Sequence, residues 1–550
     1  MAKSSAFFTN NKGKKIMKAK FLAMAALAAF TTVPAMAGGY LTNTNQSITF
    51  LRNPSQDAAI GISALYNNPA GVMFLNPGLH VSANIMSAHQ TRDITSTFAP
   101  FAYGKNNGGQ MTKKFQGVAD APVIPAIQLA YNWEKWSANF NFAITGGGGK
   151  CTFDQGLGSF ESIVSMLPAV GKSMGIKSYD FESYMKGRQY VFGFQFGGNY
   201  KVSEKLSVFA GARLVYATNN YYGYIRNIQI GTDQGYVVAK DHFKTLRDQA
   251  GLGAGVAKGK AEEYAAEAQK AMENGDMVKA TANQTIAKQY AATAEEYYNK
   301  AVQAGTLAVA TEDVGLNCDQ SGFGVTPIIG IDYRPNKHWN FAVKYEFNTH
   351  LNLTNKAANS ESANNLAQLN QFKDGVKVAE DLPALLSVGA MYSPIDEVRF
   401  NIGGHYFFDK QAKKYGDTQK LLDHGTWEVT LGAEVDVTKN WTVSAGWQNT
   451  NYGNTDAYMK DISFATNSNS IGLGVKWQVN KTVGLEAGYF HTFYQTYDKT
   501  SADYNNASNI VKLAAGEETA NALVASGQLQ GKDEFTRTNR VFGLAVTLDF

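Results

Sequence analysis

The chain has 550 residues, with 50 lysines and arginines against 46 aspartates and glutamates, a formal net charge of +4. A balance this close to neutral argues against nucleic acid as a partner. Beyond the N-terminus no stretch holds about 20 consecutive apolar residues, which excludes a transmembrane helix. The chain is rich in glycine and aromatic residues and poor in proline. This composition favours a transmembrane β-barrel, in which lipid-facing apolar residues alternate with polar residues of the lumen.

The N-terminus has the pattern of a secretory signal peptide. Five lysines between positions 12 and 20 precede an apolar run over residues 21–30, and Ala35-Met36-Ala37 is a small-x-small cleavage signal before Gly38. The apolar run is too short to cross about 30 Å of hydrocarbon as a helix. We therefore expect residues 1–37 to be removed and the mature chain to be exported. A disulfide between Cys151 and Cys318 is chemically allowed in an exported protein, and the sequence leaves open whether it forms.

Alternation of apolar and polar residues predicts the strands. In the last segment, Phe542, Leu544, Val546 and Leu548 alternate with smaller or polar residues, and the chain ends on Phe550. Fourteen such segments are predicted, an even number as single-chain bacterial barrels usually have. They are Leu79–Thr91, Ile124–Trp133, Trp136–Thr145, Gln189–Val202, Leu206–Ile228, Gly322–Tyr333, Trp339–Leu351, Ala384–Tyr392, Val398–Phe408, Trp427–Val437, Trp441–Asn449, Ser468–Val479, Val483–Tyr494 and Thr536–Phe550.

The connections between these segments alternate between tight turns and long loops. Transmembrane barrels have short periplasmic turns and long extracellular loops, whereas a soluble sandwich has no reason to sort its connections in this way. Helical spacing predicts helical insertions in the extracellular loops near residues 156–187 and 240–310. The fold class is therefore all-β: an antiparallel transmembrane β-barrel of about 14 strands with helical extracellular loops.

The segment before the first strand, residues 38–77, shows no strand alternation and contains Asn68-Pro69-Ala70. This motif, its place just before the first strand and the aromatic C-terminal strand resemble the FadL/TodX family of outer-membrane transporters, whose members carry long-chain fatty acids or aromatic hydrocarbons. The resemblance implies that residues 38–77 fold as a hatch, or plug, inside a barrel of residues 78–550. The chain departs from the family at residues 50–54, where relatives are usually richer in glycine. A barrel this wide would hold water unless it were filled. Physical reasoning therefore also predicts a plug, in agreement with the resemblance.

Candidate ligand-binding residues come from a predicted outer loop and from the mature N-terminus. Phe160, Val164 and Leu167 have helical spacing, and we predict that they line a hydrophobic capture groove on the loop surface. An equal alternative is that their helix only caps the barrel. An inner pocket is expected near Tyr40.

The resemblance also implies an inward kink of the third strand, which opens a gap in the wall beside the hatch. An apolar ligand would leave through this gap, because its free energy is lower in lipid than in a polar lumen. The third strand is predicted at Trp136–Thr145, with Asn139 and Asn141 facing the lumen. Backbone groups at a kink need partners, and Asn68 with Asn139 or Asn141 could supply them. Alternatively, these asparagines only line a wet lumen.

These observations predict a bacterial outer-membrane transporter, expected to be a monomer, for hydrophobic or amphipathic small molecules that diffuse passively past the hatch. Outer-membrane lipid and lipopolysaccharide are its other expected partners. The motif search predicts neither an enzyme nor a bound metal or cofactor. Charged residues on the predicted lumen side are expected to be solvated or paired with the plug. The alternatives are a diffusion porin for polar solutes and a surface adhesion or structural barrel.

Overall fold

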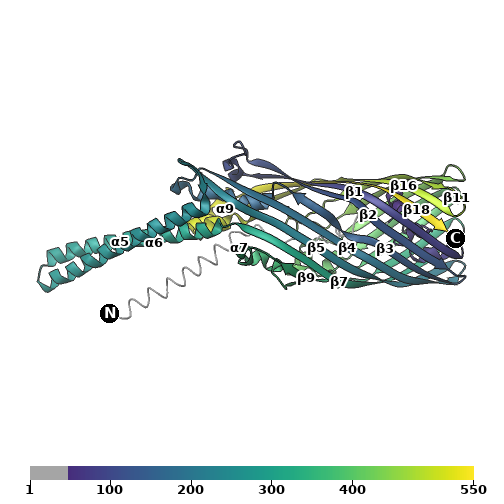
Figure 1. Ribbon diagram of the computed structural model, residues 1–550, viewed down its shortest axis with the longest axis horizontal. Helices are drawn as coiled ribbons and strands as arrows, with labels where there is room; N and C mark the ends of the chain where they lie inside the picture. The colour runs from purple at the N-terminus through teal and green to yellow at the C-terminus, as the bar shows by residue number, and fades with distance from the viewer. Residues whose placement is uncertain (1–46) are drawn as a thin grey trace.

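The computed structural model describes residues 47–550. The predicted signal peptide, its cleavage before Gly38 and the predicted pocket at Tyr40 lie outside the described residues. Fourteen long antiparallel strands form one closed barrel, because β1 pairs with both β2 and β18 (Figure 1). The all-β prediction is confirmed.

The fourteen barrel strands correspond one to one with the predicted segments. They are β1 (Gly78–Phe98), β2 (Thr112–Asn132), β3 (Trp136–Phe153), β4 (Ser178–Ser203), β5 (Leu206–Thr232), β7 (Val314–Tyr333), β8 (Trp339–Glu346), β11 (Leu385–Ile395), β12 (Val398–Phe407), β13 (Trp427–Asp436), β14 (Trp441–Asn451), β15 (Ser468–Gln478), β16 (Val483–Tyr494) and β18 (Gly531–Asp549). Four short strands extend the extracellular end, namely β6 (Gly235–Val238), β9 (Asn352–Ala357), β10 (Lys377–Ala379) and β17 (Tyr497–Ser501).

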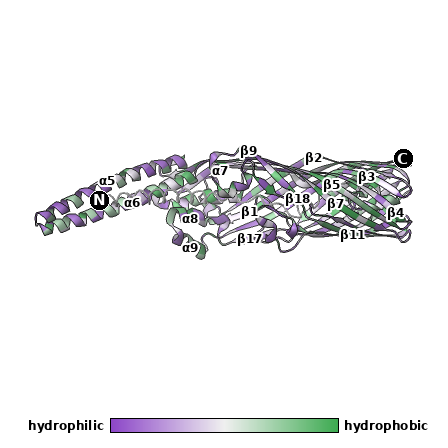
Figure 2. Ribbon diagram, turned by 90° about the horizontal axis from the view of Figure 1, so that it is seen from below, coloured by the Kyte–Doolittle hydropathy of each residue, from purple (hydrophilic) through white to green (hydrophobic). Residues whose placement is uncertain are grey.

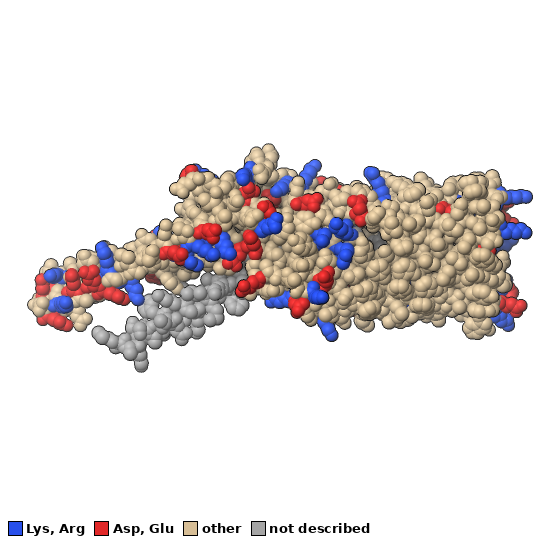
Figure 3. Space-filling view, in the orientation of Figure 1, with Lys and Arg blue, Asp and Glu red and all other residues tan. Residues whose placement is uncertain are grey.

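The outer wall carries a band of exposed apolar side chains. Large apolar residues such as Phe196, Leu214, Ile329 and Phe400 are about half exposed, and the wall around them is almost free of charged side chains (Figures 2 and 3). Aromatic pairs border the band at the end with the tight turns. They are Trp136–Tyr200, Trp339–Tyr392 and Trp441–Trp477, with ring centroids 4.5, 4.5 and 5.6 Å apart. An apolar band with aromatic girdles is the surface that a barrel presents to hydrocarbon, and the chain is an outer-membrane β-barrel.

The extracellular connections carry the helices. α5 (Ala239–Glu273) and α6 (Met277–Ala310) form a long hairpin that projects away from the barrel (Figure 1). The hairpin turns at Gly275, whose φ of 77° favours glycine, and the Asp276 side chain caps α6 by accepting from the Lys279 amide at 3.0 Å. Among the described residues, no helix combines the length and the apolar character needed to cross a bilayer.

The predicted helical insertion near residues 156–187 is shorter than expected. Its helices are α3 (Gly158–Val164), α4 (Met166–Val170) and the 3-10 turn η5 (Lys172–Met174), whereas the chain from Ser178 onward is already strand β4. α4 packs against α8 (Ser508–Ala515). Together with α9 (Glu517–Ala525), these helices belong to the largest apolar cluster among the described residues. The short helix α7 (Glu361–Asn364) and further 3-10 turns η4 (Ala99–Tyr103), η6 (Ala367–Phe372), η7 (Asp409–Gln411), η8 (Tyr415–Leu421) and η9 (Tyr504–Asn506) complete the extracellular layer.

The segment that precedes β1 lies against the inner wall. It contains α2 (Ile48–Arg52), η2 (Ile62–Ala64) and η3 (Ala70–Phe74). α2 contacts β14–β16, β18 and β1, η2 contacts β1 and β2, and η3 contacts β3–β5 and β7. The segment therefore touches most of the circumference of the barrel from within.

Candidate functional site

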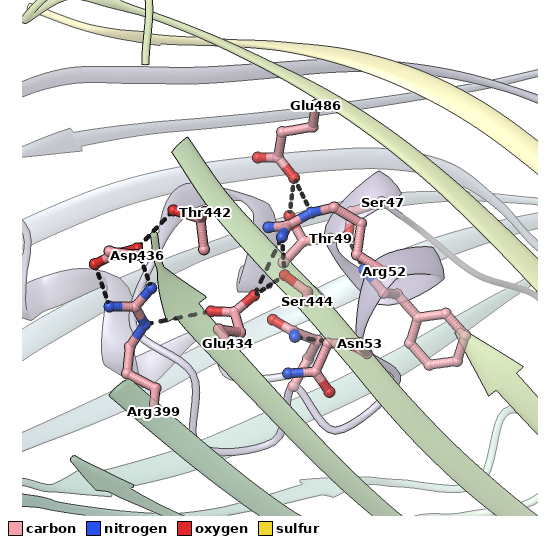
Figure 4. Close-up of polar contacts among 12 residues, drawn as sticks. Ser47, Thr49, Arg52, Asn53, Arg399, Glu434, Asp436, Thr442, Ser444 and Glu486 are labelled. Atoms are coloured by element: carbon pink, nitrogen blue, oxygen red, sulfur yellow. Dashed lines mark hydrogen bonds and ion pairs between the residues drawn. The ribbon is translucent and has the colours of Figure 1, made fainter. Parts of the chain in front are cut away.

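Arg52 connects the N-terminal segment to the inner wall through two carboxylates, one buried and one partly buried (Figure 4). Its Nε donates to Glu486 Oε2 at 3.0 Å, and its Nη1 lies 3.4 Å from Glu434 Oε1. Arg399 pairs with Glu434 from the other side and with Asp436 at 2.8 Å. Burial by itself lowers the pKa of Arg52, but the two carboxylates outweigh it and raise that pKa above its ordinary value. Arg52 is therefore charged, and its removal would leave the buried carboxylate of Glu486 without its arginine partner.

A second buried contact joins the segment to β12 and β13. His405 lies between two carboxylates, with Asp57 Oδ1 2.8 Å from its Nε2 and Glu428 Oε2 2.8 Å from its Nδ1. Gln448 and Thr450 donate to the other oxygen of Glu428 at 2.6 and 2.8 Å. The charged lumen residues thus pair with the N-terminal segment.

The Asn68-Pro69-Ala70 motif faces β4, β5 and β7. Asn68 Nδ2 donates to Asp332 Oδ2 at 2.5 Å and to the Ala59 carbonyl at 3.1 Å, while its Oδ1 accepts from the Gly71 amide at 3.1 Å. The Pro69 carbonyl accepts from Asn199 Nδ2 at 2.9 Å, and Ala70 packs against Phe209 and Ile328. The hydrogen bonds of the Asn68 side chain thus go to β7 and to its own segment, and not to backbone groups of the third strand.

Glycines on the lumen face bring the N-terminal segment into contact with the strand backbone. A Cβ added to Gly446 would lie 2.5 Å from Pro54 Cδ, and one added to Gly488 would lie 2.9 Å from Leu51 Cβ. These distances are shorter than carbon atoms tolerate. The barrel strands, rather than the segment, therefore supply the glycines that allow close packing here.

The wall has a gap between β2 and β3. Their ladder is continuous from Asn132↔Ser137 to Ala126↔Ala143 and resumes only at Ala119↔Cys151. Pro122 and Pro125 lie in this stretch of β2 and have no N–H to donate to a ladder. On β3, the register with β4 shifts twice between Ile144 and Gly149. The gap is thus an interruption of the hydrogen-bonded ladder beside an irregular stretch of β3.

The predicted kink residues lie below this gap. Asn139 and Asn141 pair regularly with Ala130 and Gln128 of β2, and Asn141 Oδ1 accepts from Gln128 Nε2 at 3.1 Å. The irregularity falls instead on the glycines at positions 146–149, where Gly147 has a φ of 96°. The irregular stretch of the third strand therefore lies at the predicted strand end, Thr145, and just beyond it, and not at Asn139 and Asn141.

A small cavity of about 40 Å³ lies in the upper lumen beside the gap. Its lining is largely apolar, with Arg92 as its charged member; it includes Gly149, Cys151, Phe153, Met185, Tyr221 and Ile462. Gly149 belongs both to this lining and to the irregular stretch of β3. The cavity and the wall gap are therefore adjacent.

Phe160, Val164 and Leu167 lie in the apolar cluster above this cavity, which also includes Cys151, Phe153, Met185 and Tyr221. Their exposed fractions are 0, 3 and 4%. The expectation of an open groove on the loop surface is therefore corrected: helix packing turns these side chains inward, over the lumen.

The described residues contain no group of three or more His, Cys, Asp or Glu side chains that could hold a metal ion. Cys151 and Cys318 are both buried and are not bonded to each other.

Comparisons with known proteins find similarity in structure but not in sequence. No family model and no curated protein matches the chain. The crystal structure of a FadL homologue from Pseudomonas aeruginosa superimposes with a TM-score of 0.55 at 12% identity, over 93% of this chain and 100% of that chain. The toluene transporter TodX from Pseudomonas putida gives 0.48 at 11% identity, over 93% of this chain and 100% of that chain. The toluene transporter TbuX from Ralstonia pickettii gives 0.46 at 14% identity, over 92% and 99%.

The chain thus has the fold of the FadL homologue. The resemblance to the FadL/TodX family is confirmed at the level of the fold.

Sequence reasoning missed Arg52 and Asp57 as the residues that connect the segment to the wall. Their signal was their charge in an otherwise uncharged stretch, residues 47–77. It also missed the wall gap, which two prolines within one barrel strand and a run of four glycines in the next could have indicated.

Proposed function

We propose that this protein takes up hydrophobic or amphipathic small molecules across the outer membrane by passive lateral diffusion, with residues 38–77 acting as a hatch. The observation that carries the proposal is an obstructed lumen together with an interrupted ladder in the wall. Residues 47–75 lie across the lumen and contact most of its circumference, whereas the ladder between β2 and β3 is broken beside an apolar cavity.

The obstructed lumen disfavours the alternative of a diffusion porin. A polar solute needs a continuous water-filled channel, as wide barrels without a plug provide. Here the lumen holds buried ion pairs and the apolar contacts of Ile48, Leu51 and Leu65, which are fully buried. An apolar solute has another route, because a path through the wall leads directly into hydrocarbon, where its free energy is lowest.

The cavity suggests the kind of ligand. Phe153, Met185 and Ile462 offer apolar contacts, which gain about 25 cal/mol per Å² of buried apolar surface. Arg92 is the charged member of the lining, so the cavity combines apolar contacts with one positive charge. This combination favours an amphipathic ligand over a pure hydrocarbon, and the cavity must widen to admit an acyl chain, because its volume is about 40 Å³. The ligand would enter beneath Phe160, Val164 and Leu167 when their helices move.

An engineered disulfide across the gap, here called a staple, tests the lateral route through the wall. A Cβ on Gly149 would lie 3.8 Å from Ala121 Cβ, within the range of a disulfide. Ala121→Cys/Gly149→Cys, made in a Cys151→Ser/Cys318→Ser background, should therefore join β2 and β3 at the upper edge of the gap. We expect oxidation to lower uptake of radiolabelled oleate into cells several-fold, and reductant to restore it.

The comparison is made within one variant, so the strain of a cysteine at Gly149, whose φ is 69°, affects both states. Ala126→Cys/Ala143→Cys places a matched staple where the ladder is already closed, and its oxidation should leave uptake unchanged. Full uptake by the oxidised gap staple would contradict the lateral route. Equal loss with both staples would show that the barrel must flex as a whole.

A further inference from the structure

Three basic side chains face outwards on β3 and β4, above the apolar band. Lys150 of β3 lies directly opposite Arg188 of β4, and Lys186 occupies the next outward position of β4, opposite Tyr222 of β5. The residues that alternate with them, Gly149, Cys151, Gly187 and Gln189, line the cavity in the lumen. Lys150, Lys186 and Arg188 must therefore project from the outer wall, and Figure 3 shows basic side chains gathered there.

None of these three side chains forms an ion pair with another described residue, although Lys186 Nζ lies 5.4 Å from the centroid of the Tyr222 ring. Among the neighbouring acidic side chains, Glu182 pairs with Arg226 and Asp120 with His89. Asp319 accepts a hydrogen bond from Asn220 and lies opposite Lys356. The three cations thus form a basic patch whose members have no carboxylate partner among the described residues.

The arrangement is unfavourable unless an anion joins it. Like charges directly opposite each other on neighbouring strands destabilise a sheet, and Lys150 and Arg188 are such a pair. An anion with several oxygens would convert this repulsion into charge-assisted hydrogen bonds, and arginine and lysine both bind phosphate well.

The outer wall below the patch is apolar and aromatic, a surface on which acyl chains can pack. Outward aromatic residues continue down β3, β4 and β5 into the apolar band. The ring centroids are 6.3 Å apart for Phe192–Tyr216, 5.0 Å for Phe142–Phe194 and 5.1 Å for Phe140–Phe196. A cationic patch at head-group depth and an apolar surface at hydrocarbon depth thus lie on the same strands.

We propose that Lys150, Lys186 and Arg188 bind the phosphate of an outer-leaflet glycolipid of the lipopolysaccharide type, whose acyl chains lie on the aromatic wall of β3–β5. Charge complementarity and the vertical order of the two surfaces identify this occupant. The bound lipid lies beside the gap between β2 and β3, and its binding is independent of what the lumen carries.

Native mass spectrometry of the full chain in detergent tests the proposal. Bisphosphorylated lipid A is added to the wild-type protein and to Lys150→Gln/Arg188→Gln. We expect the variant to bind about tenfold more weakly, the loss of about one charge-assisted hydrogen bond. Lys377→Gln/Arg540→Gln removes the same charge from exposed positions on other strands and should bind like the wild type.

Two further ligands distinguish binding of the lipid phosphate from binding of the acyl chains and from binding of free phosphate. Lipid A from which the phosphates have been removed should bind the wild type and the patch variant equally and weakly, and inorganic phosphate at millimolar concentration should displace little of the intact lipid. Unchanged binding by the patch variant, equal loss in the control variant, or full displacement by inorganic phosphate would overturn the proposal.

Discussion

At the scale of single residues, the N-terminal segment depends on polar side chains that are far apart in sequence. Asn68 is 2% exposed and makes three hydrogen bonds, one of them to the buried carboxylate of Asp332. Asn139 is also buried, but neither of its side-chain polar atoms has a hydrogen-bond partner among the described residues. Asn68 therefore stabilises the folded protein, whereas the buried polar atoms of Asn139 contribute no hydrogen bond that would offset the cost of their burial.

Asn68→Ala should destabilise the protein by about 1–3 kcal/mol, because it removes the donor to the Ala59 carbonyl and one of the two donors to the buried Asp332 carboxylate, the other being Asn340. Asn139→Ala is the matched control and should be neutral or slightly stabilising, since it removes a buried group that bonds to nothing. Thermal unfolding of the purified barrel measures both. A loss of stability in Asn139→Ala equal to that in Asn68→Ala would contradict this account.

The extracellular layer contains a buried carboxylate with a predictable response to pH. Asp461 Oδ2 accepts from the Ser159 amide at 2.7 Å at the start of α3, and burial raises the pKa of Asp461 above its ordinary 3.8. The folded layer therefore keeps its proton at pH values where the unfolded chain has lost it. Its stability is highest in acid and falls as the pH rises from 3.8 through the raised value.

Amide hydrogen exchange of residues 158–164, corrected for the intrinsic rate, should show protection that falls across this pH window. Asp461→Asn keeps an acceptor for the Ser159 amide but does not titrate, so its protection should not depend on pH there. Asp456→Asn, which changes an exposed carboxylate of the same loop that accepts from Tyr497 at 2.8 Å, should retain the wild-type dependence. The idea fails if Asp461→Asn behaves like the wild type.

At the scale of elements, helix α5 of the projecting hairpin contains glycines although its helical backbone does not require them. A Cβ on Gly255 of α5 would have no atom within 4 Å, whereas one on Gly253 would meet the ring of Tyr297 at 3.0 Å. Glycine within a helix costs about 0.5–1 kcal/mol relative to alanine.

Gly255→Ala should therefore stabilise α5 by about 0.5–1 kcal/mol, and slower hydrogen exchange of the α5 amides in the full-length protein would report it. Gly253→Ala has the same intrinsic gain but must displace Tyr297, so its net effect should be smaller. Equal slowing in both variants would mean that the Tyr297 ring moves aside without cost.

Strand prediction succeeded within the membrane and weakened above it. β4 begins at Ser178 rather than at Gln189, and β7 begins at Val314 rather than at Gly322. Alternation identifies a strand only where one face meets lipid and the other meets the lumen. Above the apolar band the outer face meets water and the inner face meets the packed loops, so apolar residues no longer mark the outer face.

At the scale of the whole molecule, the N-terminal segment and the barrel form one structure. Arg52 meets Glu486 across 434 residues of sequence at 3.0 Å, and Asp57 meets His405 across 348 at 2.8 Å. Breaking such a pair leaves a buried charge, which costs about 3–5 kcal/mol. We therefore expect the segment to stay in the lumen while ligand passes beside it.

Deletion of residues 38–77 should raise ion conductance in planar bilayers sharply, because it would empty the lumen. Arg52→Gln is the milder variant and should raise conductance less, since the contacts of Asp57 and Asn68 remain. Heat-modifiable migration in gels checks that both variants form barrels. Unchanged conductance of a correctly folded deletion variant would refute the role of the segment as a plug.

The sequence by itself determined the class of fold, the number of strands and the sorting of the connections into tight turns and long loops. These properties follow from local requirements, since each strand must present apolar residues to lipid every second position. The tertiary structure alone decided how Arg52, Asp57 and Asn68 bond to the wall, where the ladder between β2 and β3 opens, and that Phe160, Val164 and Leu167 face inward. Each of these depends on contacts between residues hundreds of positions apart, or on register between neighbouring strands, and neither leaves a periodic signal in the chain.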